Sequence, residues 1–157
     1  MSFFRLHPVP PTVVDAARAS GTDQAGNDVA PVTATGGEPL RCCLRDARPG
    51  ESLILFGHRP EIPAGPYVET GPVFAHASDC PGPEHLDRYP DGWRGRPQVL
   101  RAYDARGWIH PASTQHDGTD PERAIAAVLD QPGVVQVHSR NVVYGCYMFT
   151  VTRDGQD

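Results

Sequence analysis

The sequence contains no lysine: all 14 of its basic residues are arginine. Schiff-base chemistry on a lysine side chain is therefore excluded. No stretch approaches the ~18 apolar residues of a membrane-spanning helix, and no N-terminal segment has the layout of a signal peptide. We therefore expect a cytoplasmic protein with reduced thiols and no membrane partner.

Several motifs of common enzyme classes are also missing. The chain has no Gly-rich phosphate loop, no dinucleotide fingerprint, no Gly-x-Ser-x-Gly elbow and no His-Glu-x-x-His helix motif. Its net charge is −5, whereas proteins that bind nucleic acids are normally basic. These absences argue against nucleotide cofactors, nucleic-acid partners and the common serine and zinc hydrolases.

Proline and glycine, by contrast, are abundant, with 17 and 16 residues in a chain of 157. This content predicts many turns and long loops in a chain long enough for one domain. Residues 1–38 include the small, polar stretch 20–38 and are expected to form a partly flexible N-terminal arm. Residues 39–153 are expected to form a single globular domain.

Apolar runs bounded by turn residues predict strands in this domain. They cover residues 40–46, 51–58, 71–77, 98–104, 134–139 and 145–153. One well-defined helix is expected at about 121–131, where Asp120 can cap the N-terminus and Pro121 suits the first turn; a weaker pattern predicts a short helix over 11–19. The predicted fold is α+β, with a mostly antiparallel, curled or barrel-like sheet and long Pro/Gly-rich loops.

The last two predicted strands bring a histidine and a cysteine together. If they pair as a hairpin, Val135 and Val137 share an apolar face with Tyr147, Phe149 and Val151. In the simplest register His138 then lies directly opposite Cys146, close enough for the two side chains to touch. A cysteine beside a histidine can act as a nucleophile, so His138 is a candidate acid/base and Cys146 a candidate nucleophile.

Other side chains extend this candidate site. His76 ends a strand and would assist catalysis, while a substrate would be held by Arg101, Tyr103, Asp104, Asn141 and Tyr67. The alternative is structural: Cys146 is then a small core residue and His138 bonds a backbone carbonyl. A second alternative is a zinc ion held by His76, Cys80, His138 and Cys146, two histidines and two cysteines. The vicinal pair Cys42-Cys43 receives no role, because neighbouring side chains on a strand face opposite ways.

Four blocks of the sequence resemble a known family. They are "PLRCCLRDARPGESLILF", "GPYVETGPVFAHA", "LRAYDARG" and "VVQVHSRNVVYGCYMFTVTR", which together span about residues 39–153. They are similar to the domain-of-unknown-function family 1203, small single-domain bacterial proteins common in actinobacteria. The shared positions are Arg41, Tyr67, Gly71, Pro72, His76, Arg101, Tyr103, Asp104, His138, Asn141, Gly145 and Cys146. Leu40 departs from the family pattern, in which a cysteine is expected at this position.

The resemblance implies no activity, so the function is predicted from the residues. The leading hypothesis is a small cytosolic enzyme that acts on a small metabolite without a nucleotide cofactor, in a tailoring step of secondary metabolism. A non-catalytic module that binds a small molecule or a protein is one alternative, and a zinc-stabilised module is the other. No cofactor is expected unless the zinc alternative holds, and a homodimer is left open.

Overall fold

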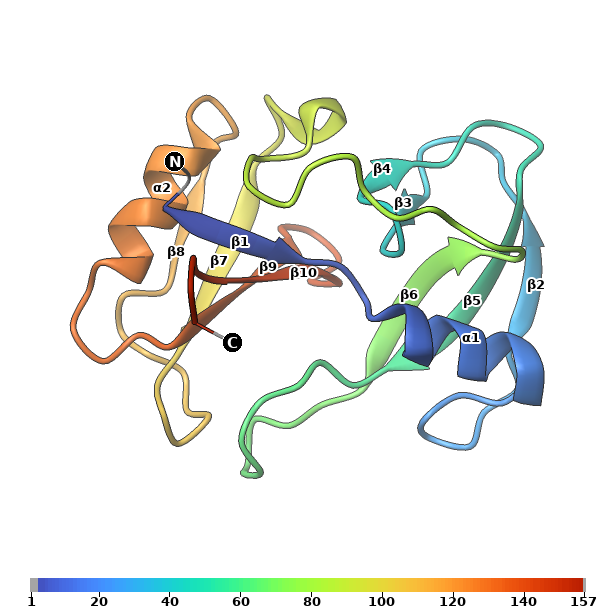
Figure 1. Ribbon diagram of the computed structural model, residues 1–157, viewed down its shortest axis with the longest axis horizontal. Helices are drawn as coiled ribbons and strands as arrows, with labels where there is room; N and C mark the ends of the chain where they lie inside the picture. Colours follow the sequence, from blue (N-terminus) through green and yellow to red (C-terminus); the bar gives the residue numbers. More distant parts are fainter. Residues whose placement is uncertain (1–2, 157) are drawn as a thin grey trace. The chain divides into compact units, whose positions relative to one another are not determined.

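The computed structural model describes residues 3–156, and the chain divides into two compact units. Unit 1 comprises residues 3–7, 61–68 and 85–156, and unit 2 comprises residues 8–60 and 69–84. Each unit carries one five-stranded sheet (Figure 1). The expected mostly antiparallel architecture is confirmed. A single curled or barrel-like sheet is wrong, because the strands form two open sheets.

The sheet of unit 1 has the strand order β1-β10-β9-β7-β8, and all of its pairs are antiparallel. Its strands are β1 (Phe4–His7), β7 (Gln98–Tyr103), β8 (Thr114–His116), β9 (Gln136–Asn141) and β10 (Tyr147–Arg153). The short 3-10 helix η1 (Asp91–Trp93) belongs to the same unit. The expected strands over 98–104, 134–139 and 145–153 correspond to β7, β9 and β10.

The β9–β10 hairpin has an irregular register. Tyr147 pairs with Arg140 and Phe149 with Ser139, so two steps along β10 match one step along β9. The extra residue is a β-bulge, and it switches the face on which the side chains before it lie. Val137, Phe149 and Val151 are fully buried as expected, but Tyr147 contacts His138 instead of sharing their face. The expected alternation is therefore wrong for Tyr147.

The predicted helix near residue 121 is α2 (Pro121–Leu129). Asp120 caps it by accepting a hydrogen bond from the Arg123 amide at 3.3 Å, and Pro121 occupies the first turn. Ile125, Val128 and Leu129 recur at helical spacing and are buried in unit 1. Each such side chain contributes about 1.5–3 kcal/mol when it is withdrawn from water. The helix therefore lies where the sequence predicted it.

The sheet of unit 2 has the strand order β2-β5-β6-β3-β4. Its strands are β2 (Ala30–Thr33), β3 (Pro39–Leu40), β4 (Arg45–Asp46), β5 (Ser52–His58) and β6 (Gly71–His76). The expected strands over 51–58 and 71–77 are β5 and β6, and they form the centre of the sheet. β3 runs parallel to β6, while the other pairs of this sheet are antiparallel. This pairing sets the β3–β4 hairpin beside the last residues of β6.

The segment 4–33, expected as part of an arm, carries three elements. These are β1, helix α1 (Pro11–Ser20) and β2, of which β2 lies within the polar stretch 20–38. α1 starts at a proline, as expected for the short helix over 11–19, and ends at Gly21, whose φ of 70° is left-handed. The described residues thus contain two α-helices, where one well-defined helix was expected. Neither these helices nor any other helix in residues 3–156 is long and apolar enough to cross a membrane.

Candidate metal centre

The β3–β4 connection is a tight turn over residues 41–44, not the expected continuous strand over 40–46. The Leu44 amide donates to the Leu40 carbonyl at 2.9 Å, and Leu44 has a left-handed φ of 56°. Leu44 is the one non-glycine residue with positive φ in the described chain, and its side chain is buried. The turn therefore carries Cys42 and Cys43 on a loop, where their side chains are not held to opposite faces of a strand.

The turn is anchored on both sides. The Arg41 amide donates to the Phe74 carbonyl of β6 at 2.9 Å, and the Arg41 carbonyl accepts from the Val9 amide at 2.9 Å. The Arg41 side chain is itself buried and donates to the Pro39 carbonyl at 2.7 Å. These bonds fix the turn against the end of β6, where His76 lies.

Four potential metal ligands converge at this place. They are Cys42 and Cys43 from the turn, His76 at the end of β6 and Cys80 from the loop that follows. One ligand atom from each lies within 4.8 Å of the other three. The Nδ1 atom of His76 is 3.5 Å from the Cys42 sulfur and 3.9 Å from the Cys43 sulfur. Residues from three segments of unit 2 thus surround one point.

The two distances from the His76 ring to cysteine sulfurs fit a tetrahedral zinc site. Zinc binds thiolate sulfur at about 2.3 Å and imidazole nitrogen at about 2.0–2.1 Å, which places tetrahedral S and N ligands about 3.6 Å apart. The two measured Nδ1–sulfur distances of His76 lie on either side of that value. Cys42 is buried, while His76, Cys43 and Cys80 are half-buried. The donor set of three thiols and one imidazole is one that structural zinc sites use.

The other nitrogen of His76 faces an ion pair. Its Nε2 lies 3.4 Å from a Glu51 carboxylate oxygen and 3.1 Å from the Arg45 guanidinium. Arg45 donates to both carboxylate oxygens of Glu51, at 2.7 and 3.0 Å, and holds the pKa of Glu51 well below its usual range. A carboxylate behind a ligating histidine orients the ring and directs its free nitrogen toward the metal. The Glu51 side chain is in the corresponding position here.

The backbone of His76 is also held. Arg18 of α1 donates to the His76 carbonyl through Nε at 3.1 Å and Nη2 at 2.9 Å. The His76 amide in turn points at the Cys42 sulfur, 3.4 Å away. The ligand positions are therefore tied to the sheet and to α1 before any ion is bound.

The three thiols differ in how readily they ionise. Hydrogen bonds from the Cys43 thiol and the His76 amide lower the pKa of Cys42 to about 5, against the opposing effect of burial. The same contact with Cys42, together with burial, raises the pKa of Cys43, and burial raises the pKa of Cys80. One thiolate forms readily, while the next must form beside an existing negative charge. A bound cation would remove that penalty, because thiolates are the metal-binding form.

The structure does not pair His138 with Cys146. Thr150 is the partner of His138 in the β9–β10 ladder, so the expected register is wrong. β9 continues to Asn141 and the turn follows at residues 142–144, so Cys146 lies at the end of the hairpin, where its carbonyl accepts from the Asn141 amide at 2.9 Å. The His138 ring is buried between the rings of Tyr103 and Tyr147, with centroids 4.6 and 5.3 Å away. Catalytic roles for His138 and Cys146 stay predictions, without the geometry that suggested them.

The other predicted substrate-binding residues of unit 1 have contacts of their own. Arg101 is the β7 partner of His138, and the Asn141 side chain accepts a hydrogen bond from Gln98 at 3.0 Å. Asp104 closes a turn by accepting from the Arg106 and Trp108 amides, and Tyr67 packs edge-on against Trp108. Substrate binding by Arg101, Tyr103, Asp104, Asn141 and Tyr67 stays a prediction.

The predicted zinc ligands are partly brought together. His76 and Cys80 belong to the cluster, but the other two members are Cys42 and Cys43, in place of His138 and Cys146. The sequence signal was present in the Cys-Cys pair. It was set aside because residues 40–46 were predicted as a strand. A turn at this position changes the interpretation of both cysteines.

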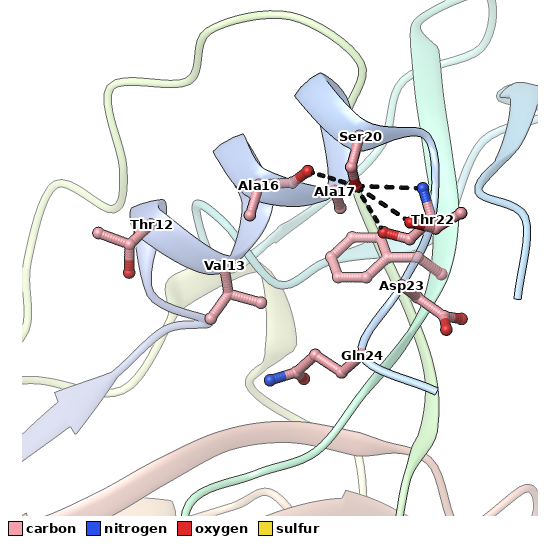
Figure 2. A pocket seen from close by; sticks show the side chains of 9 residues that line it. Thr12, Val13, Ala16, Ala17, Ser20, Thr22, Asp23 and Gln24 are labelled. Carbon is pink, nitrogen blue, oxygen red and sulfur yellow. Dashed lines mark hydrogen bonds between the residues drawn. The ribbon is translucent and has the colours of Figure 1, made fainter. Parts of the chain in front are cut away.

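A pocket of about 350 Å³ lies elsewhere in unit 2, along α1 (Figure 2). Helix residues Thr12, Val13, Ala16, Ala17 and Ser20 line it, together with Thr22, Asp23, Gln24 and Phe56. Asp23 accepts amide hydrogen bonds from Ala25, Asn27 and Gly57. Its carboxylate therefore holds the loop that contains Ala25 and Asn27 against β5. None of the predicted substrate-binding residues lines this pocket; they are Arg101, Tyr103, Asp104, Asn141 and Tyr67.

Comparison with known proteins gives one match. Searches among curated proteins and among solved structures found no significant similarity. A family model described as a protein of unknown function, DUF1203, matches residues 37–153, which include the four clustered side chains and the hairpin of unit 1. The resemblance noted in the four sequence blocks is thereby confirmed. The chain belongs to the DUF1203 family.

Proposed function

We propose that unit 2 is a zinc-binding module in which Cys42, Cys43, His76 and Cys80 hold one ion. The observation that carries the proposal is the convergence of their four ligand atoms within 4.8 Å. The thiol-rich donor set favours a soft or borderline ion, and three sulfurs with one nitrogen in a tetrahedral arrangement suit Zn²⁺. Calcium and magnesium are disfavoured, because they require oxygen ligands.

The ion in this proposal has a structural role. Four protein ligands fill a tetrahedral zinc shell, whereas catalytic zinc sites keep one position for water or substrate. The ligands come from the β3–β4 turn, the end of β6 and the loop after it. Zinc would join these segments, and its binding free energy would add to the stability of the folded chain.

Metal analysis of the purified protein tests the proposal. We expect one zinc per chain, and a Co²⁺-loaded sample should show the absorption bands of tetrahedral thiolate coordination. Cys80→Ser should lose stoichiometric zinc, while Cys146→Ser, a matched substitution in unit 1, should keep it. Circular dichroism of both variants checks that they fold. Equal zinc content in the wild type and in folded Cys80→Ser would contradict the proposal, as would a wild type without metal.

A second candidate function is an enzyme with a reactive thiol in the same cluster. The Cys42 sulfur lies 3.5 Å from His76 Nδ1, and His76 Nε2 lies 3.4 Å from Glu51, which gives a nucleophile, a base and an orienting carboxylate. Of the predicted catalytic residues, this candidate uses His76 and replaces Cys146 by Cys42. The two functions exclude each other, because Nδ1 cannot bind zinc and accept a thiol proton at once.

Alkylation by iodoacetamide separates the two candidates. If the site holds zinc, Cys42 in the protein as purified reacts slowly, and removal of the ion by a chelator exposes it. If the site is catalytic, Cys42 reacts fast at neutral pH before any chelator is added. The predicted catalytic roles of His138 and Cys146 in unit 1 are tested separately. If these roles hold, His138→Ala and Cys146→Ala should each impair the ligand binding or activity of the protein.

A further inference from the structure

We propose that the metal site is a peroxide-sensitive switch, in which Cys43 and Cys80 form a disulfide and the zinc ion is released. The inference rests on the proposed zinc binding and adds a form of regulation to it. Three sulfurs within 4.8 Å of one another supply more thiols than one disulfide needs. Two of them can therefore pair while the third remains free.

The distance between Cα atoms limits which of the three cysteines can form a disulfide. The described chain has no cis peptide bond, so Cys42 and Cys43 are joined by a trans peptide. Their Cα atoms are therefore about 3.8 Å apart, closer than the roughly 4.4–6.8 Å that a disulfide spans. Vicinal pairing is thus disfavoured, and Cys80 must be one of the two partners.

Burial and contacts select Cys43 as the second partner. Cys42 is buried, and its sulfur faces the His76 amide at 3.4 Å and the ring Nδ1 at 3.5 Å. Cys43 and Cys80 are both half-buried, so a small oxidant reaches them from solvent. Cys80 also lies in a segment that has no helix or strand, after the end of β6, and this segment can adjust to bring the sulfurs into bonding distance.

The chemistry balances with hydrogen peroxide as the named oxidant. In the zinc-loaded chain Cys43 and Cys80 are thiolates, the form that binds metal. The Cys43 thiolate attacks one peroxide oxygen, the O–O bond breaks, and the departing hydroxide takes a proton to become water. The Cys80 sulfur then attacks the oxidised Cys43 sulfur, the S–O bond breaks, and a second hydroxide leaves and is protonated to water. Two electrons pass from the two sulfurs to the peroxide, and two protons are consumed from solution.

Zinc release follows from the loss of two ligands. After disulfide formation only Cys42 and His76 remain as donors, which is too few for a stable tetrahedral site. A dithiol reductant reverses the step, because it restores both thiols and lets zinc bind again.

The test uses the zinc-loaded full chain, whose metal content is measured first. Hydrogen peroxide is then added, zinc release is followed with a chromophoric chelator, and free thiols are alkylated before peptide mass spectrometry. We expect the loss of one zinc and two free thiols per chain, and a peptide that joins Cys43 to Cys80. Cys146→Ser should release its zinc and form the Cys43–Cys80 disulfide as the wild type does. Metal-free Cys42→Ser should still form the same disulfide, whereas Cys80→Ser should form none within the chain.

Each contrary outcome has a separate meaning. A chain that holds no zinc before treatment overturns the proposed function and the switch with it. A chain that keeps both its zinc and its four free thiols under peroxide overturns the switch alone. A disulfide that joins Cys80 to Cys42 overturns the assignment of Cys43.

Discussion

Glu51 contacts two cationic or proton-donating side chains at once. Its carboxylate accepts from Arg45 at 2.7 and 3.0 Å and lies 3.4 Å from His76 Nε2. It also accepts from the Arg48 amide at 2.7 Å, which fixes its position at the turn before β5. Because an outer carboxylate orients a ligating imidazole, Glu51 should control metal affinity without touching the ion.

Glu51→Gln should therefore weaken zinc binding. The amide keeps the shape of the side chain but removes the negative charge that holds Arg45 and faces the His76 ring. The expected loss of affinity is roughly 10- to 100-fold, as for other outer-shell partners of metal ligands. A competition titration against a chelator of known affinity measures it.

Unit 1 offers a matched control for this substitution. Glu122 pairs with Arg94 as Glu51 pairs with Arg45, but it lies at the start of α2, outside the cluster. Glu122→Gln should leave zinc affinity unchanged. Equal affinity of Glu51→Gln and the wild type would show that the carboxylate does not position His76.

Leu44 combines a buried side chain with a left-handed backbone. Left-handed φ costs an L-residue other than glycine about 1–2 kcal/mol, since Cβ approaches the following carbonyl oxygen. The burial of the leucine side chain offsets this cost. The turn that carries Cys42 and Cys43 is therefore held by packing against a local strain.

Two substitutions at Leu44 separate the strain from the packing. Leu44→Ala and Leu44→Gly both lose the buried side chain and should both destabilise the fold, by about 2–5 kcal/mol for alanine. Glycine alone relieves the strain, so Leu44→Gly should be the more stable of the two by about 1 kcal/mol. Urea denaturation of both variants measures the difference. The usual order, with alanine more stable than glycine, would contradict a strained turn.

At the scale of elements, the loop after β6 is the segment that we expect to depend most on the proposed zinc ion. Residues 77–84 contain no helix or strand, and Cys80 is their one member of the cluster. β5 (Ser52–His58) is instead paired on both edges, with β2 and β6. Zinc should therefore order the loop and leave the central strand little changed.

Hydrogen exchange in the presence and absence of zinc checks this expectation. Removal of the ion should speed amide exchange in residues 78–84, because the loop then loses its attachment to the cluster. Exchange in β5 should stay slow in both states and serves as the internal control. Equal exchange of the loop with and without zinc would mean that Cys80 is not a ligand.

The elements that the sequence predicted well are those whose signal is local. The helix α2 has a cap, a first-turn proline and an apolar stripe, and β5, β6, β7, β9 and β10 are apolar runs bounded by turns. The errors arise where packing overrides local pattern. Residues 40–46 look like a strand, yet Leu44 turns the chain, and β9 continues to Asn141, so that His138 pairs with Thr150 and not with Cys146. The turn over residues 41–44 contains no glycine that would indicate it in the sequence.

At the scale of the whole molecule, the candidate site depended on long-range pairing. His76 and Cys80 are close in sequence and were predicted as ligands, but Cys42 and Cys43 join them only because β3 runs parallel to β6. The pairing of Leu40 with Phe74 spans more than thirty residues and leaves no periodic pattern in the sequence. Histidine and cysteine could thus be predicted as the ligand types. The complete set of four residues could not be identified without the strand topology.

The stability of the folded chain should also depend on His58, at the end of β5. Burial lowers the pKa of His58 to about 4, from an ordinary value near 6.5. The unfolded chain therefore binds the proton at a higher pH than the folded chain does. The stability contributed by neutral His58 is complete above about pH 6.5 and is lost as the pH falls toward 4. The total loss is about 3 kcal/mol.

Denaturant unfolding of metal-free wild type and His58→Gln, at a series of pH values from 7 to 4, measures this contribution. Both proteins lose stability in acid through their other groups, so the informative quantity is the difference between their free energies of unfolding. Glutamine takes up no proton in this range, and the wild type should therefore lose more stability than the variant does. Because the metal is absent from both samples, acid release of zinc does not enter the comparison. Parallel pH profiles would mean that His58 is not held neutral by burial in the folded chain.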